Sequence, residues 1–190
     1  MYYQELTLLP AVGTNIYHLW GRVYKQLHLA LASQMPEQGK GRIGVSFPQY
    51  EASIRNRLGC KLRLFAEDKD DIQELDIRRW LKAFSGYVHI MDVKPVPVDI
   101  DGYAVYRRVH QEESCFAKAR RYAKRHDISY EDALRFFPET KIKDYPFIRM
   151  DSETNKNSYC ITIGRIPQNG KIAEGFGSFG LDDRSTVPEF

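Results

Sequence analysis

Cysteine is scarce in this chain: Cys60, Cys115 and Cys160 are three among 190 residues, and no two of them have CxxC spacing. An odd number without paired spacing argues against a disulfide framework and a zinc knuckle, and favours a reducing compartment. No apolar stretch approaches the roughly 20 residues that a membrane helix needs. The opening residues have no charged segment followed by an apolar run, so we expect no signal peptide. These absences predict a soluble, cytoplasmic protein with no membrane contact.

Motifs for metals and cofactors are also missing. No HExxH or CxxC motif occurs, and no DxD-type acidic pair stands out, so a dedicated catalytic metal is not indicated. Residues 175–180 spell GxGxxG, but a dinucleotide-binding fold needs a helix after this motif, and Pro188 lies among the few residues that follow. We therefore expect neither a metal nor an organic cofactor.

The composition is that of a folded protein. Hydrophobic residues make up 43% and aromatic residues 13% of the chain, which is typical of a globular protein. A length of 190 residues suits one domain of ordinary size or two small ones. The formal net charge of +3 argues little by itself, so the distribution of charge carries the information.

That charge is concentrated between residues 107 and 126. This segment holds seven Lys or Arg residues against two acids, a local net charge of +5 that exceeds the +3 of the whole chain. If residues 113–126 form a helix, the helical period places its cations on one half of the circumference and its apolar residues on the other. The cations of this expected helix are Lys118, Arg120, Arg121, Lys124 and Arg125. Such a helix fits a nucleic-acid groove, although a solvated face or an acidic protein partner would explain the same pattern.

The first half of the chain alternates between strand and helix patterns. Period-two segments predict strands at 3–9, 42–47, 61–66 and 87–93, and apolar residues at helical spacing predict helices at 15–33 and 70–84. The resulting order, β-α-β-β-α-β, is that of a ferredoxin-like unit. The fold class is therefore α+β, with an N-terminal ferredoxin-like domain over residues 1–94.

A second, smaller α+β domain is expected over residues 95–190, carrying the arginine-rich helix. Two prolines, Pro95 and Pro97, make the segment 94–98 extended and mark the linker. A short helix at 129–137 has the capping pair Ser129 and Asp132, and strands are expected at 146–150 and 158–163. The tail after them is rich in glycine.

Single residues give weaker signals. His28 lies at the border between the apolar stripe and the polar face of the 15–33 helix, in its last turns, where the helix dipole favours a cationic imidazole. Periodicity alone favours a boundary histidine without a function. Ser152 and Thr154 lie in a polar loop, where most residues with a hydroxyl group only form turns. Arg107 and Arg108 add to the cationic segment, because arginines can read guanine edges bidentately while helix cations hold phosphates.

Two segments resemble the CRISPR-associated repeat-processing endoribonucleases of the type I-F branch. They are KQLHLALA at 25–32, which contains His28, and GRIGVSFP at 41–48. The basic helix ending in Arg-His-Asp at 125–127, and VPEF at 187–190, fit the same family. The resemblance implies a metal-independent enzyme that cuts CRISPR repeat RNA at the base of its hairpin. It also implies that the product stays bound in a guide-RNA complex with other type I-F subunits.

The resemblance assigns roles to particular residues. It places the catalytic histidine at His28 and the catalytic serine at Ser152. The RNA-binding positions that it implies, together with Arg107 from the charge pattern, are Arg108, His110, Arg120, Arg121, Lys124, Arg125, Thr154, Tyr159 and Phe179. Two of these depart from the family pattern, because a tyrosine is expected where Phe179 stands and a base-reading glutamine where His110 stands. Loss of that tyrosine hydroxyl favours a rival interpretation, a hairpin-RNA-binding structural subunit that does not cleave.

Overall fold

The computed structural model describes residues 1–11, 13–51, 58–109, 115–137, 145–151 and 158–190, with the backbone alone for 115–117. The chain divides into two compact units. One comprises Met1–Val109 and Tyr145–Phe190, and the other comprises His110–Asp144. We call them the core unit and the helical unit, and each is described by itself.

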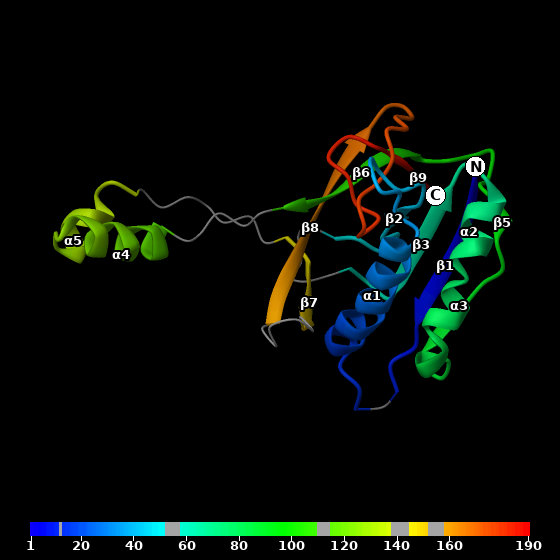
Figure 1. The fold of residues 1–190 in the computed structure, drawn as a ribbon, viewed down its shortest axis with the longest axis horizontal. Coiled ribbons are helices and arrows are strands. Elements are labelled where there is room, and N and C mark those ends of the chain that lie inside the picture. Colours follow the sequence, from blue (N-terminus) through cyan, green and yellow to red (C-terminus); the bar gives the residue numbers. More distant parts are fainter. Residues whose placement is uncertain (12, 52–57, 110–114, 138–144, 152–157) are drawn as a thin grey trace. The chain divides into compact units, whose positions relative to one another are not determined.

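The first sheet of the core unit has ferredoxin-like topology. Its strand order is β2-β3-β1-β4, and each neighbouring pair is antiparallel. Helix α1 and the α2–α3 segment pack together against this sheet (Figure 1). The elements are β1 (Tyr2–Leu8), α1 (Ile16–Ser33), β2 (Gly44–Ser46), β3 (Lys61–Ala66), α2 (Lys69–Leu75), α3 (Ile77–Trp80) and β4 (Val88–Ile90). A two-residue strand, β5 (Lys94–Pro95), also pairs with β1. The predicted α+β class and ferredoxin-like order are confirmed.

Helix α1 follows directly from its sequence pattern. Asn15 caps its first turn, since the Asn15 side chain accepts a hydrogen bond from the backbone N–H of Tyr17 at 2.8 Å. The stripe predicted from the apolar period is buried in the core of this unit. Its buried residues are Leu19, Trp20, Gly21, Val23, Tyr24, Leu27, Ala30 and Leu31. The apolar period therefore fixes which face of α1 turns inward.

The helix expected at 70–84 is wrong as a single element. Asp76 adopts a left-handed conformation with φ of 42°, which separates α2 from α3. A 3-10 turn, η1 (Lys82–Phe84), follows α3. The apolar period continues across the break because Ile72, Leu75 and Ile77 are all buried. The pattern therefore identifies the buried residues and misses the change in backbone direction.

A second antiparallel sheet, with strand order β7-β8-β6-β9, completes the core unit. Its strands are β6 (Gly102–Val109), β7 (Phe147–Asp151), β8 (Ser158–Gln168) and β9 (Val187–Glu189). Sequence reasoning expected only part of β8 and did not find β9. A hydrogen-bonded ion pair between Arg165 and Glu189, which Tyr106 joins through its hydroxyl, ties β9 to β6 and β8. The compact units divide at 109 and 145, and Lys94–Pro95 still pairs with the first sheet, so the domain bounds 1–94 and 95–190 stay a prediction.

The helical unit contains α4 (Cys115–His126) and α5 (Tyr130–Leu134). Ala119, Ala123 and Ala133 are buried between the two helices, and small side chains let the helices approach closely. Ser129 caps α5, because its hydroxyl accepts from the backbone N–H of Asp132 at 3.0 Å. The expected basic helix and the capped short helix are both present. In the described part of the chain, no helix is both long enough and apolar enough to span a bilayer.

Candidate active site

His28 lies on α1, and one nitrogen of its ring makes a hydrogen bond within the protein. Its Nδ1 is 2.9 Å from the backbone carbonyl oxygen of Ser178. A carbonyl oxygen only accepts hydrogen bonds, so Nδ1 carries the proton and, in the neutral ring, Nε2 carries the lone pair. The side chain is half-buried. A half-buried imidazole with a fixed tautomer and a basic Nε2 is suited to remove a proton from a substrate.

The ring of Phe179 covers one face of this imidazole. The two ring centroids are 3.9 Å apart and the ring planes differ by 6°. The ring and the Ser178 carbonyl together restrict both the position and the rotation of His28. Phe179, which sequence reasoning placed among the RNA-binding residues, is therefore in direct contact with the predicted catalytic histidine.

The loop that supplies Ser178 and Phe179 is anchored to the first sheet through its backbone. Gly41 and Phe176 exchange two backbone hydrogen bonds, at 2.7 and 2.9 Å, and the N–H of Val45 donates to Gly180 O at 2.9 Å. Gly180 has φ of +69°, and a Cβ there would lie 2.6 Å from Cγ1 of Val45. The glycines of the GxGxxG sequence thus permit a close approach to β2, and no helix follows them. They shape the surroundings of His28.

An ion pair fixes the far end of the same loop. Asp182 lies 2.5 Å from the Nζ of Lys40 and accepts from the backbone N–H groups of Arg184 and Ser185. Burial alone would raise the pKa of the Asp182 carboxyl, but these hydrogen bonds and the lysine charge outweigh burial and hold that pKa below its usual value. Asp182 is therefore ionised at neutral pH and keeps the loop attached to the segment before β2.

Tyr24, one helical turn before His28, also contacts this loop. Its hydroxyl donates to the carbonyl oxygen of Phe179 at 2.8 Å, and its ring lies nearly parallel to that of Phe179. Sequence reasoning missed this residue, because a tyrosine within an apolar stripe has the pattern of core packing. Its i, i+4 spacing from His28 is the one signal that could have drawn attention to it.

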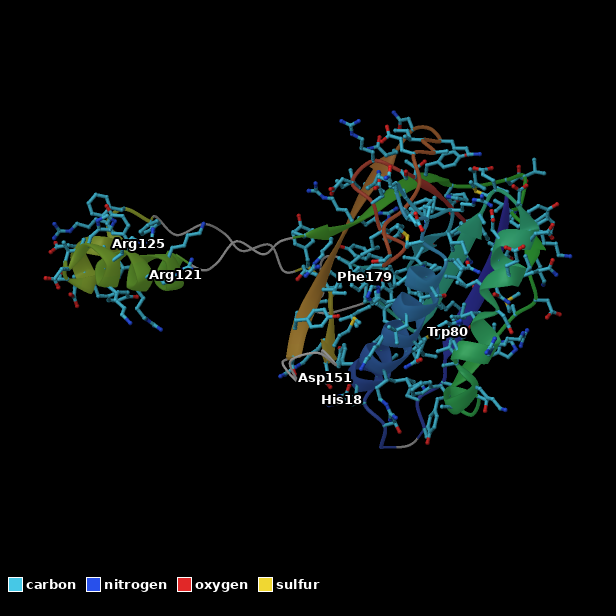
Figure 2. The ribbon with its side chains drawn as sticks, viewed as in Figure 1. His18, Trp80, Arg121, Arg125, Asp151 and Phe179 are labelled. Carbon is cyan, nitrogen blue, oxygen red and sulfur yellow. The ribbon has the colours of Figure 1, made fainter. Side chains whose placement is uncertain are left out.

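The predicted serine and its neighbours belong to the β7–β8 connection. Ser152 and Thr154 lie outside the described residues, so their roles stay predictions. The flanking residues Asp151 and Ser158 face each other in the ladder, and the Ser158 hydroxyl donates to Asp151 at 2.7 Å. Strand β7 passes α1 near its first half, where Arg149 contacts Gly21, and Figure 2 shows Asp151 toward the His18 end of α1. Tyr159 pairs with Met150 on the neighbouring strand and is half-buried.

The predicted phosphate-binding cations lie on one face of α4. Arg120, Arg121, Lys124 and Arg125 are exposed, whereas Ala119 and Ala123 are buried against α5. Figure 2 shows Arg121 and Arg125 along this helix. The amphipathic arrangement expected from the helical period is confirmed.

The two arginines of β6 differ in their surroundings. Arg108 is exposed and Arg107 is half-buried, and successive side chains of a strand point to opposite faces. The Nε of Arg107 is buried with no hydrogen-bond partner among the described residues. His110 lies outside those residues. Within them, no group of three or more His, Cys, Asp and Glu side chains could hold a metal ion.

Comparisons with known proteins agree on one family. Residues 3–190 match the family described as CRISPR-associated protein (Cas_Csy4). Over 192 aligned residues the chain is 31% identical to the "CRISPR-associated endonuclease Cas6/Csy4" of Pseudomonas aeruginosa (strain UCBPP-PA14), covering 100% of this chain and 99% of that protein. A solved structure titled "An RAMP protein binding different RNA substrates" covers 98% of both chains at 13% identity, with a TM-score of 0.35, too low to support an argument.

Proposed function

Because the chain belongs to the Cas_Csy4 family of CRISPR-associated proteins, we propose that it is an endoribonuclease that binds the hairpin of CRISPR repeat RNA and cleaves at its base. As the family resemblance implies, the proposed reaction needs no metal, and RNA carries its own nucleophile in the 2′-OH. The observation that carries the proposal is the environment of His28. Its Nδ1 donates to Ser178 O at 2.9 Å, so Nε2 is the basic nitrogen.

In the proposed reaction, Nε2 of His28 takes the proton of the 2′-OH beside the cut. The 2′-oxygen forms a bond to the adjacent phosphorus, and the bond from phosphorus to the 5′-oxygen breaks. Solvent protonates the departing oxygen. The products are a 2′,3′-cyclic phosphate and a 5′-OH. General base catalysis contributes about 10²–10⁴-fold, and alignment of the nucleotide by Ser152 supplies a further part of the rate.

The RNA is held by charge and read at few positions. The cations of α4, Arg120, Arg121, Lys124 and Arg125, follow one exposed helix face, an arrangement that supports contact with hairpin phosphates. Side chains cannot read bases in the narrow major groove of an A-form helix, so this helix recognises mainly shape and charge. Arg108 reads a guanine edge, and Arg107, His110 and Thr154 make further contacts. Tyr159 and Phe179 pack near the cut.

The proposed substrate is the precursor transcript, and the mature guide RNA stays bound after cleavage. The protein then remains in the type I-F surveillance complex with the other subunits, in the cytoplasm. Cleavage at the base leaves the hairpin intact, so the phosphates that α4 holds are the same before and after the cut. This supports retention of the product.

A modified substrate tests the chemistry. A repeat hairpin that lacks only the 2′-OH beside the cut should bind with unchanged affinity and give no product, because the nucleophile is absent. A hairpin that lacks a neighbouring 2′-OH serves as the control and should be cut normally. Cleavage of the first substrate would exclude this mechanism.

One observation favours a second function, that of a hairpin-binding subunit without cleavage activity. Phe179 stands where the family resemblance places a tyrosine, so the hydroxyl expected near the histidine is missing from that position. This alternative predicts tight binding and no product from the unmodified hairpin in a chelator, whereas the proposed enzyme gives product under the same conditions.

A further inference from the structure

Two side chains of α1 hold two successive carbonyl groups of the loop beside it. The Tyr24 hydroxyl donates to Phe179 O at 2.8 Å, and His28 Nδ1 donates to Ser178 O at 2.9 Å. Residues 24 and 28 are four apart on the helix and therefore neighbours on its surface. A shift of the Ser178–Phe179 backbone would disturb both hydrogen bonds together.

The Tyr24 side chain that makes this hydrogen bond is buried. It is 0% exposed, so no water competes for the hydroxyl. Burial raises the pKa of the Tyr24 hydroxyl far above its usual value, so this group stays protonated and acts as a donor at any physiological pH. Without this hydroxyl, the Phe179 carbonyl would lose this hydrogen bond.

The ring of Phe179 lies within the same arrangement. It is within 6° of parallel to His28 and within 11° of parallel to Tyr24. The Phe179 backbone is thus held by Tyr24 while its side chain stacks on His28. Any rotation of this residue moves the ring that covers the imidazole.

We propose that Tyr24 is a positioning residue for His28. It fixes the Ser178–Phe179 backbone, which in turn fixes the tautomer and the orientation of the imidazole. The inference rests on the proposed function, in which His28 acts through Nε2. The phenol hydroxyl that the resemblance places at 179 is absent from Phe179, and Tyr24 holds the backbone of that residue.

The test combines an isosteric variant with a spectroscopic measurement. In Tyr24→Phe the ring remains and the donor is lost. Nitrogen-15 NMR of the imidazole resonances reports which nitrogen carries the proton, and His28→Gln assigns the His28 signals among the five histidines. The control is Tyr50→Phe, which removes a tyrosine-to-carbonyl hydrogen bond of 3.0 Å, to Ile163 O, elsewhere in the core unit.

We expect wild type and Tyr50→Phe to show the Nδ1–H tautomer at neutral pH, and Tyr24→Phe to show a mixture of the two tautomers. Single-turnover cleavage by Tyr24→Phe should fall about tenfold with unchanged hairpin affinity, a loss comparable to that of one hydrogen bond. An unchanged His28 tautomer in Tyr24→Phe overturns the proposal. An Nε2–H tautomer of His28 in the wild type also overturns it, and that result does not depend on whether the variant folds.

The NMR result also separates two kinds of failure. A wild-type protein that binds the hairpin without cutting it refutes the proposed function, yet its His28 tautomer still reports whether Tyr24 positions the ring. A wild-type protein that cuts the hairpin, together with a Tyr24→Phe variant that cuts equally fast, refutes the role of Tyr24 alone.

Discussion

Gly21 of α1 lies against the carbonyl oxygen of Arg149 on β7, so closely that a Cβ at residue 21 would come within 2.2 Å of that oxygen. Helix α1 packs against both sheets, and Gly21 is a residue of α1 that faces β7 of the second sheet. The contact joins the helix that carries His28 to the strand that leads into Ser152. The absence of a side chain at residue 21 therefore permits the two sheets to share one helix.

The first prediction concerns this contact. Gly21→Ala should lower the free energy of unfolding, since overpacking costs about 1–3 kcal/mol and exceeds the gain of about 1 kcal/mol that alanine brings to a helix interior. Thermal unfolding measures the change. Gly86→Ala is the control, because a Cβ at residue 86 meets nothing within 4 Å. A Gly21→Ala protein as stable as Gly86→Ala would contradict the close packing.

The phosphate-binding face of α4 gives the second prediction. Lys124→Gln should weaken binding to hairpins of different sequence about equally, and should reduce the slope of log K against log salt by about one. Titrations at several salt concentrations measure the slope. The control is Arg135→Gln, since Arg135 is exposed at the C-cap of α5, outside α4, and pairs with Asp132 at 3.5 Å. An equal effect of both substitutions would show that Lys124 of α4 attracts RNA only through the net charge of the protein and makes no specific phosphate contact.

Arg108 gives the third prediction, on base recognition. Arg108→Lys keeps the charge but removes the planar fork that contacts two atoms of guanine. We expect a loss of about 1–3 kcal/mol in affinity and a weaker preference for guanine at one position of the repeat. Competition binding with single-base variants of the hairpin measures both effects. If Arg108→Lys binds and discriminates as well as wild type, Arg108 contacts a phosphate instead.

Glu5 gives the fourth prediction, on pH. Burial of Glu5 raises its pKa, but hydrogen bonds from Lys61 and Arg63, with their charges, outweigh burial and lower it below 4.5. A lowered carboxyl pKa stabilises the folded state above the unfolded pKa, and this contribution is lost as the pH falls through the folded value. Wild type should therefore lose stability below about pH 4.5, the ordinary value for a glutamate.

The matched variants are Glu5→Gln and Glu37→Gln, the latter at an exposed position after α1. Glu5→Gln should be less stable than wild type at pH 7 and should lose less stability on acidification. Melting temperatures from pH 7 to pH 3 measure the difference. Parallel curves of melting temperature against pH for wild type and Glu5→Gln would show that Glu5 does not cause the loss of stability in acid.

Local pattern predicted the elements well and their junctions poorly. The period of α1 and the alternation of β3 are local properties, so the sequence was sufficient to place them. The break at Asp76 was missed because left-handed geometry at one aspartate leaves the apolar period intact. Strand β9 was missed because three residues carry little pattern, and pairing with β6 stabilises them.

The surroundings of His28 could not be predicted in the same way. Ser178 and Phe179 are 150 and 151 residues away from it along the chain, and no local pattern links segments so distant. Charge period alone predicted the exposed face of α4. The roles of Ser152 and Thr154 came from family resemblance, because a hydroxyl in a polar loop has no distinguishing pattern of its own.

A paired binding and cleavage assay on the cognate repeat RNA in EDTA shows whether His28 acts as the base in a metal-independent cleavage. It compares wild type with His28→Ala, and with His89→Ala, a histidine exposed on the edge strand β4, as the control. We predict product from wild type and His89→Ala, equal affinity in all three proteins, and cleavage by His28→Ala slower by about 10²–10⁴-fold. Tight binding by all three with no product from any, or full cleavage by His28→Ala, would contradict this account.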